Sequence, residues 1–305
     1  MVDRRLGTAW NRQDRSEVGV ALVLVLWFVA ALTVLVTSVV SLVRVDVRAS
    51  ADIVSAARAT ALADAAIEWA LQEALQDPSR FHLSVPREYE FEGVVITITP
   101  RWDTGFVNLN AAPQELLREL LLVAGGLSMD DAERFAQAII EWRTPGLQHV
   151  VDDYRAANVP FVPRGGNFVA PEDLLQVLGF DLNLFRKLAP AVTVHGRSSR
   201  VNPVFAPLEV LQVLAGGDTV AAHQVYERLR AGDVGVDRSR LRQEFIMAEG
   251  FGRAVRMQAA LRVDGVSFVR VRWVQRQRDP RREPWRTLHA SLQSNPMGAN
   301  ASHVR

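Results

Sequence analysis

The 305-residue sequence contains no cysteine, and its charges almost cancel. Without cysteine there is no disulfide scaffold, no thiolate zinc site and no cysteine nucleophile. Lysine and arginine together number 35 against 34 acidic residues, and Lys187 is the one lysine. A near-neutral chain is not typical of a general phosphate-backbone binder, which needs a net basic surface. The sequence also lacks H-E-x-x-H, Walker-loop and G-x-S-x-G patterns, so we predict no enzyme activity.

One long apolar run lies near the amino terminus. Residues 18–43 carry no charge, and this stretch exceeds the roughly 20 residues needed to cross a bilayer. A buried core helix is usually shorter, and the apolar region of a cleaved secretory signal spans only about 7–15 residues. We therefore predict a membrane-inserted helix over residues 20–43. An alanine-rich amphipathic helix should follow it as far as Gln76, because Asp77-Pro78 stops a helix.

A polar leader with four arginines precedes the apolar run and ends in Ser-Glu-Val-Gly. A short basic leader, a glycine and then an apolar helix resemble the class III signal of type IV pilins and pseudopilins. That resemblance implies cleavage between Gly19 and Val20 by a prepilin peptidase, and an ordinary signal anchor is the alternative. Most family members have glutamate as the fifth mature residue, whereas this chain has Leu24. An apolar residue at that position suggests a subunit at the tip of a filament.

Strand patterns lie on both sides of a helical middle. Residues 89–99 and 101–107 are rich in branched and aromatic side chains, residues 254–274 alternate about Asp264-Gly265, and a last short strand covers 284–290. Asp-Gly between alternating runs predicts a hairpin with a type I′ turn. The pattern indicates an α+β fold with a small antiparallel sheet and a large inserted helical domain. The predicted segments are a leader at 1–19, a transmembrane half-helix at 20–43, an amphipathic helix with the first strands at 44–106, an inserted all-helical domain at 107–250, closing strands at 251–292 and a disordered tail at 293–305.

The inserted segment repeats itself. The run VNLNAAPQEL from Val107 returns as VNPVFAPLEV from Val201, and residues 169–174 form a third, partial copy. Each copy begins a helix that ends at glycine, which resembles helix-hairpin-helix modules. Such modules often bind DNA, so a membrane-tethered DNA-binding or DNA-uptake protein is the main alternative function. However, the next helices open with Ser128, Asp181 and Asp218, whose side chains would occupy the helix-start amides. We therefore expect a structural role and no nucleic-acid partner.

The ordered motifs together resemble the minor pseudopilin K family of type II secretion systems. They are the leader, VNLNAAPQELL, AIIEWR, DDYRAANVPFVPRGGNFVAPEDLLQVLGF, LAPAVTVHG and VNPVFAPLEVL. The resemblance implies a pilin-like fold with a long amino-terminal helix. It also implies a single-pass protein of the bacterial inner membrane, in contact with its lipid, whose carboxy-terminal body lies in the periplasm. Its partners would be minor pseudopilins I and J and then the major pseudopilin. A minor pilin of a type IV pilus is a further alternative.

Family members can bind calcium in the insertion through an acidic stretch that commonly runs Trp-Arg-Asp-x-Asp. This chain has Trp142-Arg143-Thr144-Pro145-Gly146 there, without either aspartate. Calcium takes six to eight oxygen ligands, often several carboxylates. Asp152 and Asp153 are the remaining candidate calcium ligands, so calcium is the one candidate cofactor.

Overall fold

The computed structural model describes residues 14–77, 84–247, 250–277 and 283–295, without the side chains of residues 14–22, 36–50 and 294–295. The chain divides into two units, residues 1–57 and residues 58–305. Helix α1 (Asp14–Gln76) belongs to both and ends at the residue before Asp77-Pro78, where the sequence predicts its end. No helix in the described part of the chain has both the length and the apolar character that a bilayer crossing requires. The predicted span at 20–43 extends into residues whose side chains lie outside this description.

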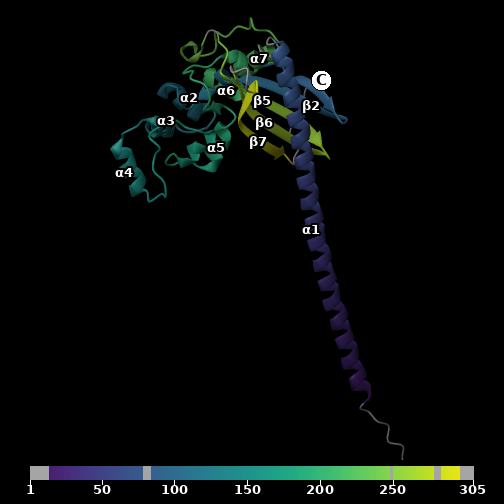
Figure 1. The fold of residues 1–305 in the computed structure, drawn as a ribbon. Helices are drawn as coiled ribbons and strands as arrows, with labels where there is room; N and C mark the ends of the chain where they lie inside the picture. Colours follow the sequence, from purple (N-terminus) through teal and green to yellow (C-terminus); the bar gives the residue numbers. More distant parts are fainter. Residues whose placement is uncertain (1–13, 78–83, 248–249, 278–282, 296–305) are drawn as a thin grey trace, which may run out of the picture. The chain divides into compact units, whose positions relative to one another are not determined.

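The second unit contains an antiparallel sheet with the strand order β1-β2-β5-β6-β7. Figure 1 labels β2, β5, β6 and β7 of this sheet. The strands are β1 (Arg87–Phe91), β2 (Val94–Trp102), β5 (Ala254–Val263), β6 (Val266–Arg276) and β7 (Trp285–Asn295). The strands β2 and β5 pair although about 150 residues separate them, because the insertion leaves the sheet after Trp102 and returns before Ala254. The mixed helix and antiparallel-sheet fold predicted from the sequence is confirmed. Strand β7 continues to Asn295, past the boundary predicted at residue 292.

Residues 58–76 of α1, which belong to the second unit, pack on one face of the sheet. Their buried side chains are mostly alanines, which let the helix backbone approach closely: Ala59, Ala63, Ala66, Ile67, Ala70, Leu71 and Ala74. Polar contacts fix its position, since Asp64 binds the Arg270 guanidinium of β6 through two hydrogen bonds of 3.0 Å. Tyr89 of β1 donates a hydrogen bond of 2.9 Å to Glu73. The amphipathic pattern predicted for this part of the sequence therefore corresponds to a face of α1 that is buried against the sheet.

Two hairpin turns shape the sheet, and the sequence analysis identified one of them. Asp264 and Gly265 both have positive φ, 50° and 81°, as a type I′ turn requires. The prediction of a continuous strand from 89 to 99 is wrong, because Glu92 (φ 51°) and Gly93 (φ 73°) make a second tight turn between β1 and β2. Gly93 is a sign of this break in the sequence, but glutamate is an unusual residue at φ > 0, so Glu92-Gly93 is a weaker turn signal than Asp264-Gly265.

The insertion forms its own hydrophobic core beside the sheet (Figure 1). Its elements are η2 (Asp103–Gly105), β3 (Val107–Asn108), α2 (Gln114–Val123), α3 (Met129–Arg143), α4 (Gln148–Ala156), η3 (Pro171–Gln176), α5 (Leu182–Leu188), β4 (Val192–Thr193), η4 (Pro203–Phe205), α6 (Leu208–Leu214), α7 (Thr219–Arg230) and η5 (Gln243–Phe245). Trp142, Leu116, Leu120 and Ile139 are among its fully buried side chains.

The insertion differs from the sequence prediction in three places. It is not all-helical, since β3 and β4 form a short parallel pair with a hydrogen bond of 2.9 Å from the Leu109 amide to the Thr193 carbonyl. The third repeat copy contains a 3-10 helix, η3, where the sequence predicts an α-helix. This helix starts at Pro171 and is only six residues long. The strand predicted over 101–107 is interrupted by η2, where the chain leaves the sheet.

Candidate partner-binding surfaces and ligand sites

The starts of the helices that would face DNA in a helix-hairpin-helix module are already occupied. Ser128, Asp181 and Asp218 cap α3, α5 and α7, and each side chain accepts a hydrogen bond from the amide three residues further on, at 3.2, 2.7 and 2.9 Å. The capping predicted from the sequence is confirmed. A phosphate at α5 or α7 would have to displace a carboxylate from those amides, which is unfavourable for two groups of the same charge.

Asn108 and Asn202 occupy equivalent positions in the two full copies of the repeat. The side-chain oxygen of each accepts a hydrogen bond from the amide two residues further on, at 2.8 and 3.1 Å, which closes an Asx turn. The amide groups of the same side chains bind distant carbonyls, that of His195 for Asn108 (2.7 Å) and that of Gly250 for Asn202 (3.2 Å). Both asparagines are buried. The repeated motif therefore encodes a repeated local structure that fixes a distant segment.

Other residues of the family motifs hold loops inside the insertion. Arg143, from AIIEWR, donates hydrogen bonds of 2.6 and 2.7 Å to the carbonyls of Leu109 and Ala112, just ahead of α2. Burial lowers the pKa of its guanidinium from the ordinary arginine value. Carbonyl oxygens serve as acceptors here in place of a carboxylate, so Arg143 acts as a brace between α3 and the turn before α2.

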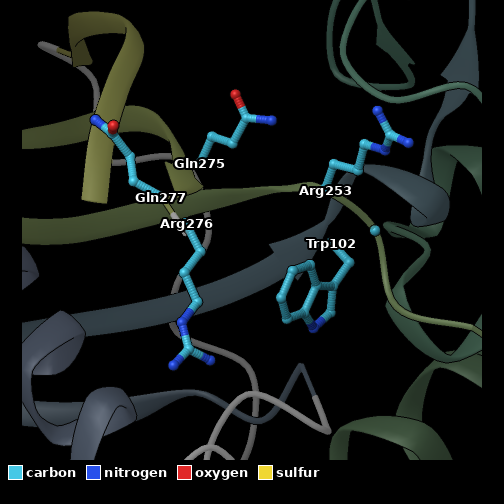
Figure 2. A pocket seen from close by; sticks show the side chains of 6 residues that line it. Trp102, Arg253, Gln275, Arg276 and Gln277 are labelled. Atoms are coloured by element: carbon cyan, nitrogen blue, oxygen red, sulfur yellow. The ribbon is translucent and has the colours of Figure 1, made fainter. Parts of the chain in front are cut away.

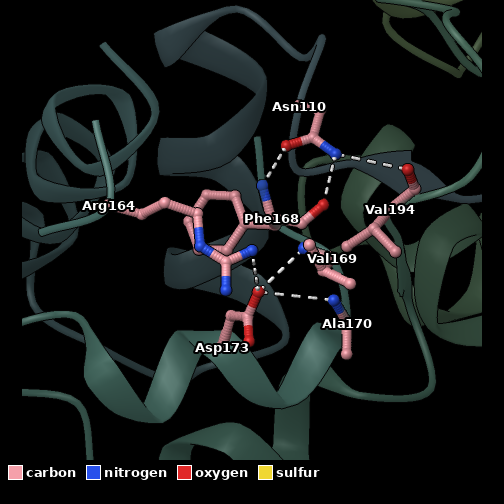
Figure 3. A network of polar contacts seen from close by, with 7 residues as sticks. All are labelled: Asn110, Arg164, Phe168, Val169, Ala170, Asp173 and Val194. Carbon is pink, nitrogen blue, oxygen red and sulfur yellow. Dashed lines mark hydrogen bonds and ion pairs between the residues drawn. The ribbon is translucent and has the colours of Figure 1, made fainter. Parts of the chain in front are cut away.

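Figure 3 shows how the segment before η3 is held. Asn110 accepts a hydrogen bond of 2.7 Å from the Phe168 amide and donates to the carbonyls of Phe168 (3.0 Å) and Val194 (3.2 Å). Asp173 accepts a hydrogen bond of 2.7 Å from the Val169 amide and lies 3.7 Å from the Arg164 guanidinium. Asn110 and Asp173 thus satisfy backbone groups of this loop, so both side chains hold the loop in place.

Asp103 joins the two ends of the insertion. It follows β2 directly, and its buried carboxylate accepts hydrogen bonds from the amides of Arg253 (3.1 Å) and Ala254 (3.3 Å), where the chain re-enters the sheet. A side chain at Gly252 or Gly196 would overlap this carboxylate. Burial raises the pKa of Asp103, and the hydrogen bonds from the backbone partly oppose that shift. Sequence analysis missed this residue because its partners lie about 150 positions away.

The two candidate calcium ligands do not form a coordination shell. Asp152 and Asp153 are exposed neighbours on α4, so their carboxylates point in directions about 100° apart around the helix. Asp152 already binds Arg155 (3.0 Å) and Gln148 (3.2 Å) of the same helix. Among the described residues, no group of three or more acidic, histidine or cysteine side chains is arranged to hold a metal ion. Calcium takes six to eight oxygen ligands, so these two carboxylates alone do not complete a site. Calcium binding at Asp152 and Asp153 stays a prediction.

The predicted cleavage site, Gly19 and Val20, lies outside the residues whose side chains the structure describes. Leu24 lies within the described part of α1, and 54% of its surface is exposed. The apolar side chains around it are exposed to a similar degree, for example Trp27 (72%) and Phe28 (61%). This part of α1 therefore presents an apolar surface in the isolated chain.

A second open surface lies where β2 and β6 end and β5 begins. A cavity of about 700 Å³ is lined by Trp102, Gly252, Arg253, Gln275, Arg276 and Gln277. In Figure 2, Trp102 and Arg276 point to one side of the sheet, and Arg253 and Gln275 point to the other. Trp102 packs against Phe251 with ring centroids 5.6 Å apart, and Phe251 is 54% exposed. Aromatic residues and arginine are enriched at protein interfaces, so this edge is a candidate partner-binding surface.

The described histidines include one pair that shares a cavity, but its environment does not suit proton transfer at neutral pH. His195 packs against Trp273 with tilted rings whose centroids are 4.9 Å apart, and it lines a cavity of about 290 Å³ together with His289. Burial, and then the charge of His289, lowers the pKa of His195 to about 4. Such a histidine is neutral throughout the physiological range and serves as a packing residue.

Comparison with known proteins agrees with the sequence motifs. Residues 104–197 match the family model described as type II secretion system (T2SS), protein K. No curated protein matches the chain. Among solved structures, the chain is similar to one in the crystal structure of the GspK-GspI-GspJ complex from the type 2 secretion system of enterotoxigenic Escherichia coli. The TM-score is 0.51 at 17% sequence identity, over 81% of this chain and 98% of that one, which is a likeness of fold.

The matched region begins at the first turn of the insertion, includes Asn108, Asn110, Arg143 and Asp173, and ends just after His195. The matched region therefore contains residues that brace the insertion, and over residues 104–197 this chain is similar to protein K of type II secretion systems.

Proposed function

We propose that this chain is a minor pseudopilin at the tip of the type II secretion pseudopilus. There it helps to start or cap the filament that exports folded proteins across the outer membrane. The observation that carries the proposal is the protein K domain at residues 104–197, built on a sheet and insertion similar in fold to a chain of the GspK-GspI-GspJ complex. By analogy with that complex, its partners are minor pseudopilins I and J, and the major pseudopilin follows below them.

We further propose that residues 20–43 of α1 anchor the protein in the inner membrane by a single pass, with the body in the periplasm. The exposed apolar side chains between Val23 and Leu35 support this, because such a surface is unfavourable in water and favourable in lipid. Cleavage by a prepilin peptidase after Gly19 would leave Val20 as the mature amino terminus. Replacing Gly19 with a bulky residue should then leave an uncleaved precursor in the inner membrane, detected by its mass. A normally processed Gly19 variant would contradict this assignment.

The position of Leu24 supports a place at the tip. A buried glutamate at this position in other pilins can offset the amino terminus of a neighbouring subunit, and Leu24 offers no such group. Leu24→Glu should still insert, since a carboxyl near the interface can be protonated or paired. The variant should be recovered from the body of sheared filaments, whereas the unaltered chain should not.

The direct test of the function is co-purification of the full-length chain, in detergent, with minor pseudopilins I and J from the same bacterium. We expect a stable ternary complex by size-exclusion chromatography. The matched control omits one partner at a time, which shows whether assembly needs both. Elution of the chain alone in the presence of both partners would overturn the proposal.

A further inference from the structure

Two arginines lie directly opposite each other on the sheet face turned away from α1. Arg101 of β2 pairs with Arg256 of β5. The neighbouring residue Met257 pairs with Arg272, whose guanidinium binds Glu68 of α1 at 2.8 Å. Because side chains alternate along a strand, Arg101 and Arg256 point to the opposite face. Like charges directly across a sheet are destabilising unless another group compensates them.

A cavity of about 500 Å³ lies over Arg101, between this sheet face and α7. Its walls carry mainly neutral polar groups: the hydroxyls of Ser84, Thr97, Thr99 and Tyr226 and the amide of Gln258. Two charged side chains, Glu88 and Arg230, also line it, and both are exposed. The volume is in the range of pockets that bind small ligands or a single inserted side chain.

Arg101 is buried in this cavity, and none of the ion pairs found among the described residues includes it. It is 9% exposed, and its Nη2 donates a hydrogen bond of 3.3 Å to the neutral hydroxyl of Tyr226. Its Nε has no hydrogen-bond partner within the described part of the chain, and the same holds for the buried hydroxyl of Ser84. A buried charge is costly unless it is paired, so the pocket contains donors that lack an acceptor.

The surroundings of Arg256 agree with this interpretation. Its guanidinium lies over the Phe106 ring, 5.5 Å from the centroid, and none of the ion pairs found among the described residues includes it. Burial, and then the positive charge of Arg101, lowers the pKa of Arg256 to about 10, while Glu209 acts in the opposite direction. The positive potential of the two arginines is therefore only partly compensated by groups of this chain.

We propose that the cavity over Arg101 is a carboxylate-binding site. The planar guanidinium matches a carboxylate, and charge-assisted hydrogen bonds of this kind are about twice as strong as neutral ones. Ser84 and Gln258 would complete the shell from the cavity wall, and Arg230 at the rim adds attraction that Glu88 reduces. The carboxylate belongs either to a small anion in solution or to an acidic side chain of a partner chain.

Thermal unfolding of the full chain in detergent tests the site with acetate as the probe. Acetate, compared with chloride at equal ionic strength, should raise the Tm by about 2–5 °C near saturation. Arg101→Met should abolish the shift. Arg262→Met is the matched control, because Arg262 is an exposed arginine on the same face of β5, and it should keep the full shift.

If Arg101→Met does not fold, Ser84→Ala serves as the second variant and should reduce the acetate shift at least about twofold, since it removes one hydrogen-bond donor. An equal effect of acetate and chloride, or an acetate shift that persists in Arg101→Met, would overturn the proposal.

A second measurement, which rests on the proposed function, distinguishes a carboxylate of a partner chain from a small carboxylate in solution. If a partner supplies it, Arg101→Met should weaken the complex with minor pseudopilins I and J by about tenfold or more, while Arg262→Met does not. If the complex is unchanged and acetate still stabilises the unaltered chain, the ligand is a small free carboxylate. The acetate measurement needs no partner, so failure of the proposed function would leave it interpretable.

Discussion

Asp103 is the residue on which the attachment of the insertion depends most directly. Its carboxylate binds the amides of Arg253 and Ala254, so Asp103→Ala would leave one part-buried and one buried donor without this acceptor. We expect the free energy of unfolding to fall by about 1–3 kcal/mol, measured by denaturant unfolding in detergent. A change below about 0.5 kcal/mol would mean that other groups or water replace the carboxylate fully.

The neighbouring glycine offers a matched pair of variants. Gly252→Ala would place a methyl group on the Asp103 carboxylate, so it should destabilise the chain strongly. Gly93→Ala meets no atom within 4 Å and suffers only from its φ of 73°, so it should cost about 1 kcal/mol. Equal effects of the two substitutions in unfolding experiments would count against the close packing around Asp103.

His195 predicts how stability depends on pH. Its folded pKa is about 4, below the ordinary value of 6.5, so between these values the unfolded chain binds more protons than the folded one. Stability should therefore fall as the pH decreases from 6.5 to 4. Asp103, whose pKa is raised, contributes oppositely, because its stabilisation is lost as the pH rises above 3.8.

Thermal melts at pH 7.5 and 5.0 check the histidine effect. The difference in Tm between the two pH values should be smaller in His195→Gln than in the unaltered chain. His149→Gln is the control, since that side chain is 65% exposed. A pH dependence unchanged by His195→Gln would refute the assignment.

At the scale of elements, the contact between α1 and the sheet depends on a partly buried ion pair. Asp64 receives two hydrogen bonds of 3.0 Å from Arg270, and the two side chains are 31% and 16% exposed. Asp64→Asn removes the charge and one acceptor, so we expect a loss of about 1–3 kcal/mol in unfolding free energy. Glu92→Gln is the control, because its pair with Arg58 is 3.5 Å long and exposed, and it should cost less than about 0.5 kcal/mol.

The two hairpins of the sheet show which elements a sequence predicts. Asp264-Gly265 was predictable because aspartate and glycine are the residues that commonly accept positive φ in a type I′ turn. Glu92-Gly93 also has positive φ at both residues, 51° and 73°, yet glutamate rarely adopts it, so this pair is a weaker turn signal than Asp-Gly. The turn forms where β1 pairs with β2 in the folded sheet, and the few residues around the turn do not predict that pairing.

The site residues divide in the same way. The caps at Ser128, Asp181 and Asp218 were predictable, since a capping side chain binds an amide only three residues away. Asp103 and the pairing of Arg101 with Arg256 depend on contacts across about 150 residues. No local pattern reports such contacts, although the motif VNLN and its copy VNPV did mark the two equivalent asparagines.

For the molecule as a whole, the motif residues have one consistent role. Asn108, Asn202 and Arg143 use their hydrogen-bonding capacity on backbone groups inside the insertion. In the described part of the chain, the exposed apolar surface of α1 and the cavity over Arg101 are two of the places where groups lack partners of their own. The chain thus combines a braced body with unsatisfied surfaces, which is the arrangement expected of a subunit that assembles with others.

The same distribution of charge predicts the behaviour of the whole chain toward DNA. A helix-hairpin-helix protein binds phosphate with free amides and a basic surface, whereas here the amides are capped and the formal net charge is +1. In fluorescence anisotropy with a labelled duplex, we expect no saturable binding below about 10 µM protein at roughly 150 mM salt.

Asp218→Ser distinguishes the two causes of that weak binding, because serine keeps the cap of α7 and removes its charge. If the near-neutral net charge of the chain alone prevents DNA binding, the variant should bind DNA no better than the unaltered chain. If the carboxylate alone prevents binding, the variant should bind DNA with an affinity that falls steeply between about 50 and 200 mM salt, roughly tenfold for every two phosphates that the protein neutralises. Saturable, salt-sensitive binding by the unaltered chain would favour the DNA-binding alternative over assembly in a pseudopilus.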